Sequence, residues 1–240
     1  MSYPQLQMLI AGEWTNGTSG VTENVICPAD GTILGELPHA SKEDLDDALN
    51  SSLEGFNKWR SETPLNRQSI LEKAAKILER EFDKNSQNLT REMGKPLAEA
   101  KIEMQVAIDL LRWYGEEGKR VYGRIIPSRI PNMEHEARKV PVGPVLAFVA
   151  WNFPATNVMR KVAGALAAGC SITIKPSEET PATAIAIGHA LMEAGLPAGV
   201  LNIVFGVPSE VSEHLLASPI PRKLSFTGSV PVGIHLQKLA

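Results

Sequence analysis

The second half of the chain alternates short apolar runs with segments of helical periodicity. Beyond Pro141, apolar runs of strand length occupy residues 145–149, 172–174, 200–204 and 223–226. The segments that follow them predict helices at residues 155–168, 182–194 and 209–217 and from about Pro231. Strands that are apolar throughout are typical of parallel sheets covered on both faces. The pattern therefore predicts an α/β fold in which helices flank a parallel sheet.

The first forty residues follow a different pattern, in which turn signals separate short apolar runs. Asn16-Gly17 is a typical hairpin signal, and Ala29-Asp30-Gly31 separates Val25-Ile26 from Ile33-Leu34. We expect a small antiparallel ribbon in this part of the chain.

Helix start and stop signals follow. Ser41 and Asp44 are spaced as in a capping box, Thr63-Pro64 supplies a cap and a first-turn proline, and Gly94 ends a short helix. Apolar residues at spacings of three and four place one face of each of three longer helices in the core. These faces are Leu45, Ala48, Leu49, Ser52, Leu53 and Phe56 in the first, Ile70, Leu71, Ala74, Ala75, Leu78 and Phe82 in the second, and Leu97, Ala100, Met104, Ala107, Leu111 and Tyr114 in the third.

Residues 122–142 read as a protruding ribbon, because Pro127, Pro131 and Pro141 lie between residues of alternating character. An exposed ribbon either blunts its own edge or pairs with another subunit, and the mixed signs of its charges favour the second. We therefore divide the chain into an N-terminal ribbon with helices (1–121), an oligomerisation ribbon (122–142) and a sheet domain (143–240).

Composition narrows the classes of function. The 240 residues are 43% hydrophobic, and 24 Lys and Arg against 27 Asp and Glu give a net charge of −3. No basic excess is present to bind nucleic acid or an anionic membrane. The apolar stretches are too short to span a bilayer, and the start lacks a signal-peptide pattern. With two distant cysteines, Cys27 and Cys170, the sequence predicts a cytoplasmic protein whose partner is a small molecule or another protein.

Ligands of parallel α/β sheets bind at the carboxyl ends of the strands. Asn152 follows the first strand, where its amide could donate to a developing oxyanion or simply cap the next helix. Lys175, Ser177 and Glu178 follow the second strand. A carboxylate there can accept from both hydroxyls of a ribose with the lysine as a nearby donor, and the alternative is a solvated loop pair.

Glycines follow the third and fourth strands. Gly206 comes after the third, and Phe226, Gly228 and Ser229 lie between the fourth and a helix. Glycine lets a phosphate approach the backbone, and a helix N-terminus offers amide donors. Because the usual glycine fingerprint after the first strand is absent, the motifs alone predict no more than a nucleotide-binding α/β domain.

Other chemistries have little support in the sequence. The five histidines are too scattered for a metal site, so we predict none, and no phosphate-binding Gly-Lys-Ser/Thr loop occurs. Cys170 enters a buried strand, where a thiol is more often a small hydrophobe than a nucleophile.

Taken in order, the strand-end residues resemble the NAD(P)-dependent aldehyde dehydrogenases. The matching elements are Trp151-Asn152-Phe153-Pro154, Ala165 to Gly169, Lys175-Pro176-Ser177-Glu178, Ala194 to Pro197, Gly199 to Asn202, and Phe226-Thr227-Gly228-Ser229. Three further segments look most like the succinate-semialdehyde branch: Glu92 to Pro96, Tyr122 to Pro127, and Met159-Arg160-Lys161. The resemblance implies a Rossmann-like sheet and a dehydrogenase.

The resemblance also implies NAD as the cofactor. Lys175 and Glu178 would grip the adenine-side ribose, and Gly228-Ser229 would approach the pyrophosphate. The other residues of the expected cofactor site are Trp151, Ser177, Gly206 and Phe226. A carboxylate at the 2′ position repels a phosphate, so Glu178 favours NAD over NADP.

For the substrate, the resemblance implies roles for two residues. Asn152 would hold the oxyanion formed when a cysteine thiolate attacks the aldehyde. Arg160 matches an arginine that pairs with the remote carboxylate of the substrate, and its alternative is a surface helix charge. The implied reaction is oxidation of succinate semialdehyde, or a similar carboxylated semialdehyde, by a homodimer or homotetramer.

The family's catalytic cysteine and glutamate have no match in these 240 residues, and Cys170 does not align with that cysteine. We therefore expect the cofactor-binding, N-terminal half of an enzyme, inactive alone and without the catalytic domain. The alternative is a stand-alone nucleotide-binding or assembly module that keeps the fold without catalysis.

Overall fold

A six-stranded sheet forms the centre of the computed structural model, which describes residues 3–240. Its strands run in the order β10 (Lys223–Phe226), β7 (Val145–Phe148), β8 (Ile172–Lys175), β9 (Leu201–Ile203), β1 (Met8–Ile10) and β2 (Glu13–Thr15). The first four are mutually parallel, as the unbroken apolar runs predicted. The predicted α/β fold with a Rossmann-like parallel sheet is therefore confirmed.

The strand order reverses beside β7. From β7 the chain moves outward through β8 to β9, and it then returns to the other side of β7 to form β10. In open α/β sheets, ligands bind at the carboxyl ends of the two strands that flank such a reversal. Here those ends lead into residues 149–153 and 227–229.

Two N-terminal strands extend the sheet at the edge away from β10. β1 pairs antiparallel with both β9 and β2, so this edge of the sheet is mixed. The hairpin turn is Ala11-Gly12, and both residues have positive φ (53° and 90°). The prediction that Asn16-Gly17 forms a hairpin turn is wrong, because these residues follow β2 and lead to β3. Gly17 there packs beside the Asp44 carboxylate instead.

A separate hairpin lies beyond the main sheet. It consists of β3 (Thr22–Ile26) and β4 (Ile33–Pro38), paired antiparallel. The turn falls at residues 28–30, which overlaps the predicted turn at Ala29-Asp30-Gly31.

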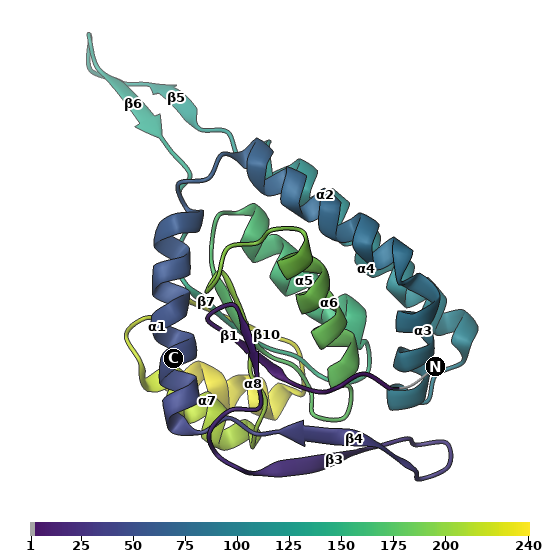
Figure 1. Cartoon of the computed structure of the whole chain (residues 1–240). Coiled ribbons are helices and arrows are strands. Elements are labelled where there is room, and N and C mark those ends of the chain that lie inside the picture. Colours follow the sequence, from purple (N-terminus) through teal and green to yellow (C-terminus); the bar gives the residue numbers. More distant parts are fainter. Residues whose placement is uncertain (1–2) are drawn as a thin grey trace.

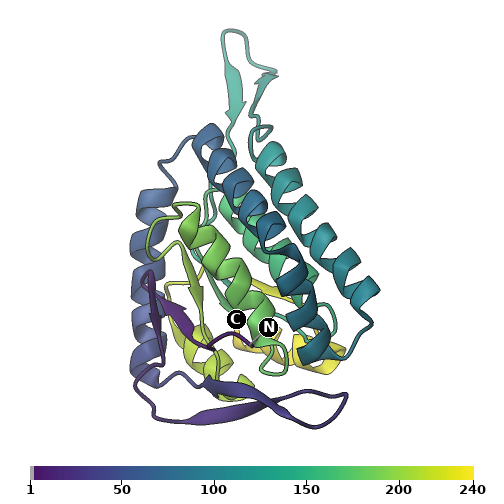
Figure 2. The same cartoon turned by 45° about the vertical axis from the view of Figure 1, so that its right-hand side comes forward.

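Helices cover both faces of the sheet (Figures 1 and 2). On one face lie α5 (Pro154–Ala167) and α6 (Pro181–Glu193). An outer layer packs over them and comprises α2 (Pro64–Arg80), α3 (Phe82–Met93) and α4 (Leu97–Gly118). The opposite face is covered by α1 (Lys42–Trp59), which contacts β1, β8 and β9, with α7 (Pro208–Ala217) beside it and α8 (Val230–Leu239) against α7.

The first three helices begin or end at the capping residues that the sequence predicts. Ser41 and Asp44 form a reciprocal capping box at the start of α1, with hydrogen bonds of 3.1 and 2.8 Å. The Thr63 hydroxyl accepts from the backbone N–H of Asn66 (3.1 Å) at the start of α2. Gly94 ends α3 in the left-handed conformation with φ 81°. The predicted apolar faces are largely buried, but Leu53 and Leu97 are exposed, the latter because it begins α4.

A buried amide links three of these elements. Asn202 in β9 accepts from the backbone N–H of Ala11 (2.9 Å) and from the Ser51 hydroxyl (3.0 Å), and it donates to the Ala48 carbonyl (3.2 Å). One side chain thus fixes the β1–β2 turn and α1 against the sheet.

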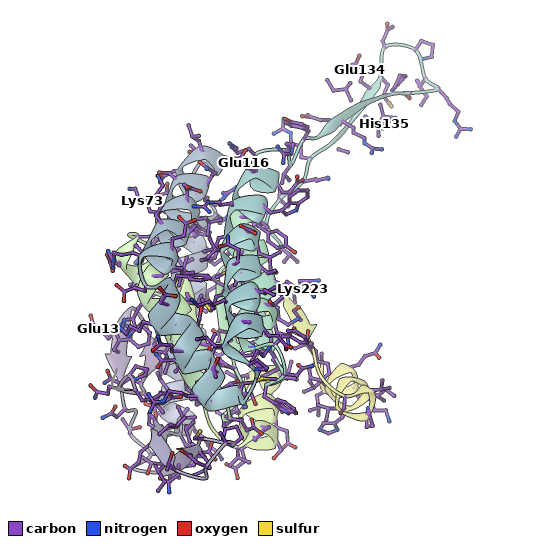
Figure 3. All side chains as sticks on the ribbon, turned by 90° about the vertical axis from the view of Figure 1, so that its right-hand side faces the viewer. Glu13, Lys73, Glu116, Glu134, His135 and Lys223 are labelled. Carbon is purple, nitrogen blue, oxygen red and sulfur yellow. The ribbon has the colours of Figure 1, made fainter. Side chains whose placement is uncertain are left out.

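The predicted ribbon at residues 122–142 projects from the body of the molecule (Figure 1). It contains β5 (Arg124–Pro127) and β6 (Glu134–Ala137), which pair only with each other. Figure 3 shows Glu134 and His135 well away from the helices, and every residue of the two strands is exposed. Its pairing with another subunit stays a prediction.

Candidate functional site

The candidate residues lie around two pockets at the carboxyl end of the sheet. The first, of about 230 Å³, is lined by residues that end or follow β7, β8 and β10, among them Lys175, Glu178 and Phe226. The second, of about 620 Å³, lies between α4 and the start of α5 and is lined by Asn152 and Arg160.

Lys175 and Glu178 form an ion pair in the first pocket, with side chains that are 6% and 15% exposed. Lys175 Nζ also donates to the Pro176 carbonyl (3.3 Å), and Glu178 Oε1 accepts from the backbone N–H of Gly206 (3.4 Å). These contacts bring Lys175 and Glu178, at the end of β8, together with Gly206, which follows β9. A solvated loop pair does not describe them, since both charges are largely withdrawn from water.

Ser177 lies in the same pocket and is buried. Its hydroxyl is hydrogen-bonded to the carboxylate of Glu179. Residues 175–179 thus place the ammonium of Lys175, the hydroxyl of Ser177 and the carboxylates of Glu178 and Glu179 at the carboxyl end of the sheet.

The turn between β10 and α8 supplies the opposite wall of the first pocket. A Cβ on Gly228 would lie 2.4 Å from the tip of the Phe226 ring, so a larger residue there would have to displace this ring. Ser229 is the N-cap of α8, and no side chain caps this helix. The first N–H groups of a helix have no partner within it, and Pro231 removes one of them. Those of Ser229, Val230 and Val232 therefore remain available to a ligand at this turn.

The N-terminus of α5 is occupied by a carboxylate of the chain itself. Glu103 of α4 accepts from the backbone N–H groups of Ala155 (2.9 Å) and Thr156 (3.2 Å). Its second oxygen is paired with Lys95, and both side chains are buried.

The N-terminus of α6 is occupied in the same way. Glu92 of α3 accepts from the backbone N–H groups of Ala182 (2.9 Å) and Thr183 (3.1 Å) and from the Tyr3 hydroxyl (2.8 Å). Burial raises the pKa of Glu92 to about 7, and the hydrogen bonds donated by Thr183, Tyr3 and Ala182 oppose that rise. Burial and the adjacent Glu92 also raise the pKa of the Tyr3 hydroxyl.

These two internal carboxylates change where an anion can bind. In the common dinucleotide folds, the helix after the first strand receives the pyrophosphate at its N-terminus. Here α5 and α6 already bind Glu103 and Glu92, so that position is closed to phosphate. Among residues 3–240, no carboxylate binds in this way at the start of α8, beside Gly228. This arrangement accounts for the missing glycine fingerprint after β7.

In the second pocket, the amide of Asn152 has one free end. Its Oδ1 accepts from Asn157 Nδ2 (3.3 Å), and within the described residues its Nδ2 has no partner. Asn152 does not cap α5, because the N-cap is Phe153 and Glu103 supplies the cap. Its exposed amide can therefore donate to an oxygen in the pocket.

Arg160 lies one and a half turns into α5, on the wall of the same pocket. It is exposed, and no carboxylate among residues 3–240 pairs with it. Burial and the neighbouring Arg160 lower the pKa of Lys161, which donates to the Ser225 hydroxyl of β10 (3.2 Å). The apolar wall of the pocket includes Ile102, Val106 and Phe153.

Trp151 lies at the second pocket, with Asn152 and Arg160. Its side chain is exposed and lines the pocket of Asn152 and Arg160, whereas Val149 and Ala150 line the first pocket. Residues 149–152 thus pass from one pocket directly to the other, so the two are neighbours.

The contacts of Lys95, Glu92 and Glu103 were not predicted from the sequence. A signal was present for Glu103, because it shares a helical face with Ala100, Met104 and Ala107, all of which are buried. A carboxylate among core residues indicates a buried partner.

The described residues hold neither a metal site nor a membrane-spanning helix. Between residues 3 and 240, no three His, Cys, Asp or Glu side chains gather in the manner of metal ligands. In that same stretch, no helix has the length and apolar character needed to cross a bilayer. Cys27 and Cys170 are unpaired and buried.

Comparison with known proteins shows the family of the chain. The model of the family described as "Aldehyde dehydrogenase family" matches residues 14–240. The chain is 47% identical to 4-(hydroxymethyl)benzenesulfonate dehydrogenase TsaD1 of Comamonas testosteroni over 98% of this chain and 49% of that protein. It is 38% identical to the NADP(+) succinate-semialdehyde dehydrogenase GabD of Escherichia coli strain K12 over 97% of this chain and 48% of that protein.

Among known structures, the fold matches the crystal structure of succinate-semialdehyde dehydrogenase from Burkholderia pseudomallei. The TM-score is 0.96 at 40% identity, and the match covers 98% of this chain and 49% of that one. The chain thus spans about half the length of the relatives that it matches.

Proposed function

Because this chain belongs to the aldehyde dehydrogenase family, we propose that it is the N-terminal, cofactor-binding half of an enzyme that oxidises an anionic aldehyde with NAD. We refer to that enzyme as the whole enzyme. The observation that carries the proposal is the adjacency of the two pockets. One presents the nucleotide-binding candidates, and the other presents the free amide of Asn152, with residues 149–152 joining them.

The first pocket fits a dinucleotide in its chemistry. Lys175 and Glu178 would bind the adenine-side ribose, with Ser177, Gly206 and Phe226 around it. The open N–H groups at Ser229 and the small Gly228 would receive the pyrophosphate. When bound, the nicotinamide would accept hydride from the substrate carbon.

Glu178 supports NAD rather than NADP. Its carboxylate is paired with Lys175 and is held by the N–H of Gly206. A 2′-phosphate would bring further negative charge to a carboxylate that already pairs with the ammonium of Lys175, whereas a 2′-hydroxyl could donate to it.

Asn152 would stabilise the oxyanion at the substrate carbon. A preorganised amide donor acts when negative charge develops on that oxygen, and it needs no reorganisation at that moment. The bond from Asn157 to Asn152 Oδ1 turns the amide so that Nδ2 is the end available to the substrate. Trp151 would close the edge between substrate and nicotinamide.

Arg160 would select an aldehyde that carries an anionic group. Two relatives have names that contain such a group, succinate in one and benzenesulfonate in the other. A guanidinium can bind either anion through two parallel hydrogen bonds. The apolar wall formed by Ile102, Val106 and Phe153 would hold the carbon skeleton. Succinate semialdehyde, or a similar carboxylated semialdehyde, is the substrate that we propose first.

The remaining parts of the proposal concern assembly. The three-part division at residues 1–121, 122–142 and 143–240 assigns the projecting ribbon to pairing between subunits of a homodimer or homotetramer. The reaction also needs a cysteine and a glutamate that this chain does not provide, so the 240 residues alone should give no turnover.

The test is the rate of NADH formation by the whole enzyme with succinate semialdehyde and with an uncharged aldehyde of similar length. Arg160→Ala should lower kcat/KM for succinate semialdehyde about 10- to 100-fold, from the ~1.5–3 kcal/mol of a hydrogen bond to a charged group. The uncharged aldehyde serves as the matched control and should change little. Equal losses with both aldehydes would return Arg160 to the role of a surface charge. NADH formed by the 240-residue chain alone would overturn the proposed division of the enzyme.

A further inference from the structure

A buried ion pair lies directly beneath the loop that carries Asn152. Lys95 follows the end of α3, Glu103 lies in α4, and their charged groups are in direct contact. The two side chains are only 7% and 3% exposed. A charge removed from water to this extent must be paired and hydrogen-bonded, which ties it to a small set of neighbours.

Glu103 connects this pair to the backbone of α5. It accepts from the N–H groups of Ala155 (2.9 Å) and Thr156 (3.2 Å), the second and third residues of the helix. Two hydrogen bonds to a single carboxylate oxygen fix the helix N-terminus in direction as well as position.

Lys95 connects the same pair to the loop before the helix. Its Nζ lies 3.4 Å from the carbonyl oxygen of Asn152, to which it donates, and 4.4 Å from the centroid of the Phe153 ring. An ammonium over a ring face is attracted to it. Lys95 thus holds the residue that bears the candidate oxyanion donor and the residue that follows it.

The α6 helix shows what a carboxylate cap requires by itself. Glu92 caps α6 through Ala182 and Thr183 with help from the Tyr3 hydroxyl, and in the described chain no lysine joins it. A cap on α5 would therefore be complete with Glu103 alone. The contacts of Lys95 go to the loop at residues 152–153, so they serve the position of that loop.

We propose that Lys95 and Glu103 are positioning residues, which act together to aim the Asn152 amide at the oxygen of the substrate. The inference rests on the proposed function of Asn152. It adds that the aim of Asn152 is set from α3 and α4, outside the sheet domain that carries it.

Kinetics of the whole enzyme test this inference. Lys95→Met keeps the length of the side chain but removes the donor to the Asn152 carbonyl. We expect kcat to fall roughly 10- to 100-fold, the scale of a displacement of about 1 Å at a reacting group. KM for NAD should stay the same, because Lys95 does not reach the first pocket. Glu92→Gln, a matched change in the cap of α6, should leave kcat unchanged.

A double-substitution cycle separates positioning from general damage. In an Asn152→Ala background, Lys95→Met should cause no further loss of kcat, because the group that it positions is gone. An equal fall of kcat in both backgrounds would overturn the inference, and so would an unchanged kcat in Lys95→Met alone. If Asn152→Ala itself leaves kcat unchanged, the proposed function of Asn152 fails instead.

Hydrogen–deuterium exchange of the 240-residue chain gives a second readout that needs no activity. Glu103→Gln retains an acceptor for the α5 N–H groups and is the milder variant should Lys95→Met fail to fold. We expect faster exchange at residues 151–157 in Glu103→Gln and unchanged exchange at residues 181–184. Glu92→Gln should give the opposite pattern. Unchanged exchange at residues 151–157 in Glu103→Gln would contradict the proposed positioning role of Lys95 and Glu103.

Discussion

Glu92 and Glu103 each bring a carboxylate to the N-terminus of a helix that belongs to another part of the chain. The partial positive charge of a helix N-terminus attracts an anion, and in this molecule the chain supplies that anion twice. These contacts also determine where a phosphate could bind. A phosphate is excluded from the starts of α5 and α6, and the start of α8 is where we propose that the pyrophosphate of the cofactor binds.

The buried carboxylate of Glu92 should make stability depend on pH. Its pKa is about 7 in the folded chain against the ordinary 4.5 of a glutamate side chain, because burial disfavours the charged form. As pH rises between these values, the unfolded chain loses this proton before the folded chain does. The free energy of unfolding should therefore fall across that range, by up to ~3 kcal/mol.

Urea unfolding of the chain at several pH values measures this effect. Glu92→Gln should remove most of the decline between pH 4.5 and 7. The matched control is Glu99→Gln, a change at an exposed glutamate of α4, which should keep the decline. Equal slopes in wild type and Glu92→Gln would show that Glu92 does not titrate in this range.

Glu178 allows a second prediction at the scale of single residues. Glu178→Gln removes the negative charge and should raise the affinity for NADP relative to NAD, since repulsion of the 2′-phosphate disappears. The measurement is the ratio of the two dissociation constants by calorimetry. Glu213→Gln, the same change at an exposed residue of α7 that does not line the first pocket, is the control. An unchanged ratio in Glu178→Gln would remove the basis for assigning NAD.

At the scale of elements, α1 depends on a close approach to the loop before β9. A Cβ added to Gly55 would lie 2.3 Å from the carbonyl carbon of Gly199 and 2.5 Å from the backbone nitrogen of Val200. Backbone atoms cannot move aside as side chains can. Glycine at residue 55 therefore lets the helix pack directly on the loop.

This contact reverses the usual effect of a substitution. Alanine in place of glycine within a helix normally stabilises it by up to about 1 kcal/mol. Gly55→Ala should instead destabilise the chain by ~2 kcal/mol or more, because the overpacked contact is with backbone. Gly164→Ala in α5 is the control, since its Cβ would meet only the Tyr114 ring at 3.5 Å. Thermal unfolding that ranks the two variants in the opposite order would contradict this account.

The elements themselves were predictable to within a few residues, because caps and apolar spacing are local signals. Ser41, Thr63 and Gly94 act as their residue types suggest. The first hairpin turn was not predictable, since Ala11-Gly12 lacks the polar residues typical of such turns. Its place is set by a bond to Asn202, 191 residues away in the chain.

The candidate site also contains some residues that could be predicted from the sequence and others that could not. Residues at strand ends could be found because parallel strands align their carboxyl ends, which explains why Lys175, Glu178 and Phe226 share a pocket. The residues that contact the starts of α5 and α6 at this end of the sheet could not be found from the sequence. Glu92 and Glu103 lie in α3 and α4, and Lys95 lies between these two helices, whose packing over α5 and α6 is decided by tertiary contacts.

At the scale of the whole molecule, the ribbon has no partner within the described chain. Ile125 is 73% exposed, and Ile126 is exposed on the other face of the same strand. The sheet also ends at β10, whose first residue, Lys223, is visible at the edge in Figure 3. Apolar residues on both faces of a projecting ribbon are typical of a surface that another subunit covers.

Self-association of the whole enzyme should therefore depend on the ribbon. Ile125→Lys should shift the enzyme toward smaller species in sedimentation velocity, because a charge would be buried in the contact between subunits. Ile33→Lys, the same change at an exposed residue of β4, should leave the sedimentation unchanged. Identical behaviour of both variants would mean that the ribbon does not join subunits.

We propose that this chain supplies the oxyanion donor and the cofactor site of an NAD-dependent aldehyde oxidation. The most direct test is the kcat of NADH formation from succinate semialdehyde in the whole enzyme carrying Asn152→Ala. We predict a loss of about 10²- to 10³-fold, the usual effect of removing one oxyanion donor, with unchanged affinity for NAD. A kcat equal to that of the unsubstituted enzyme would contradict the account.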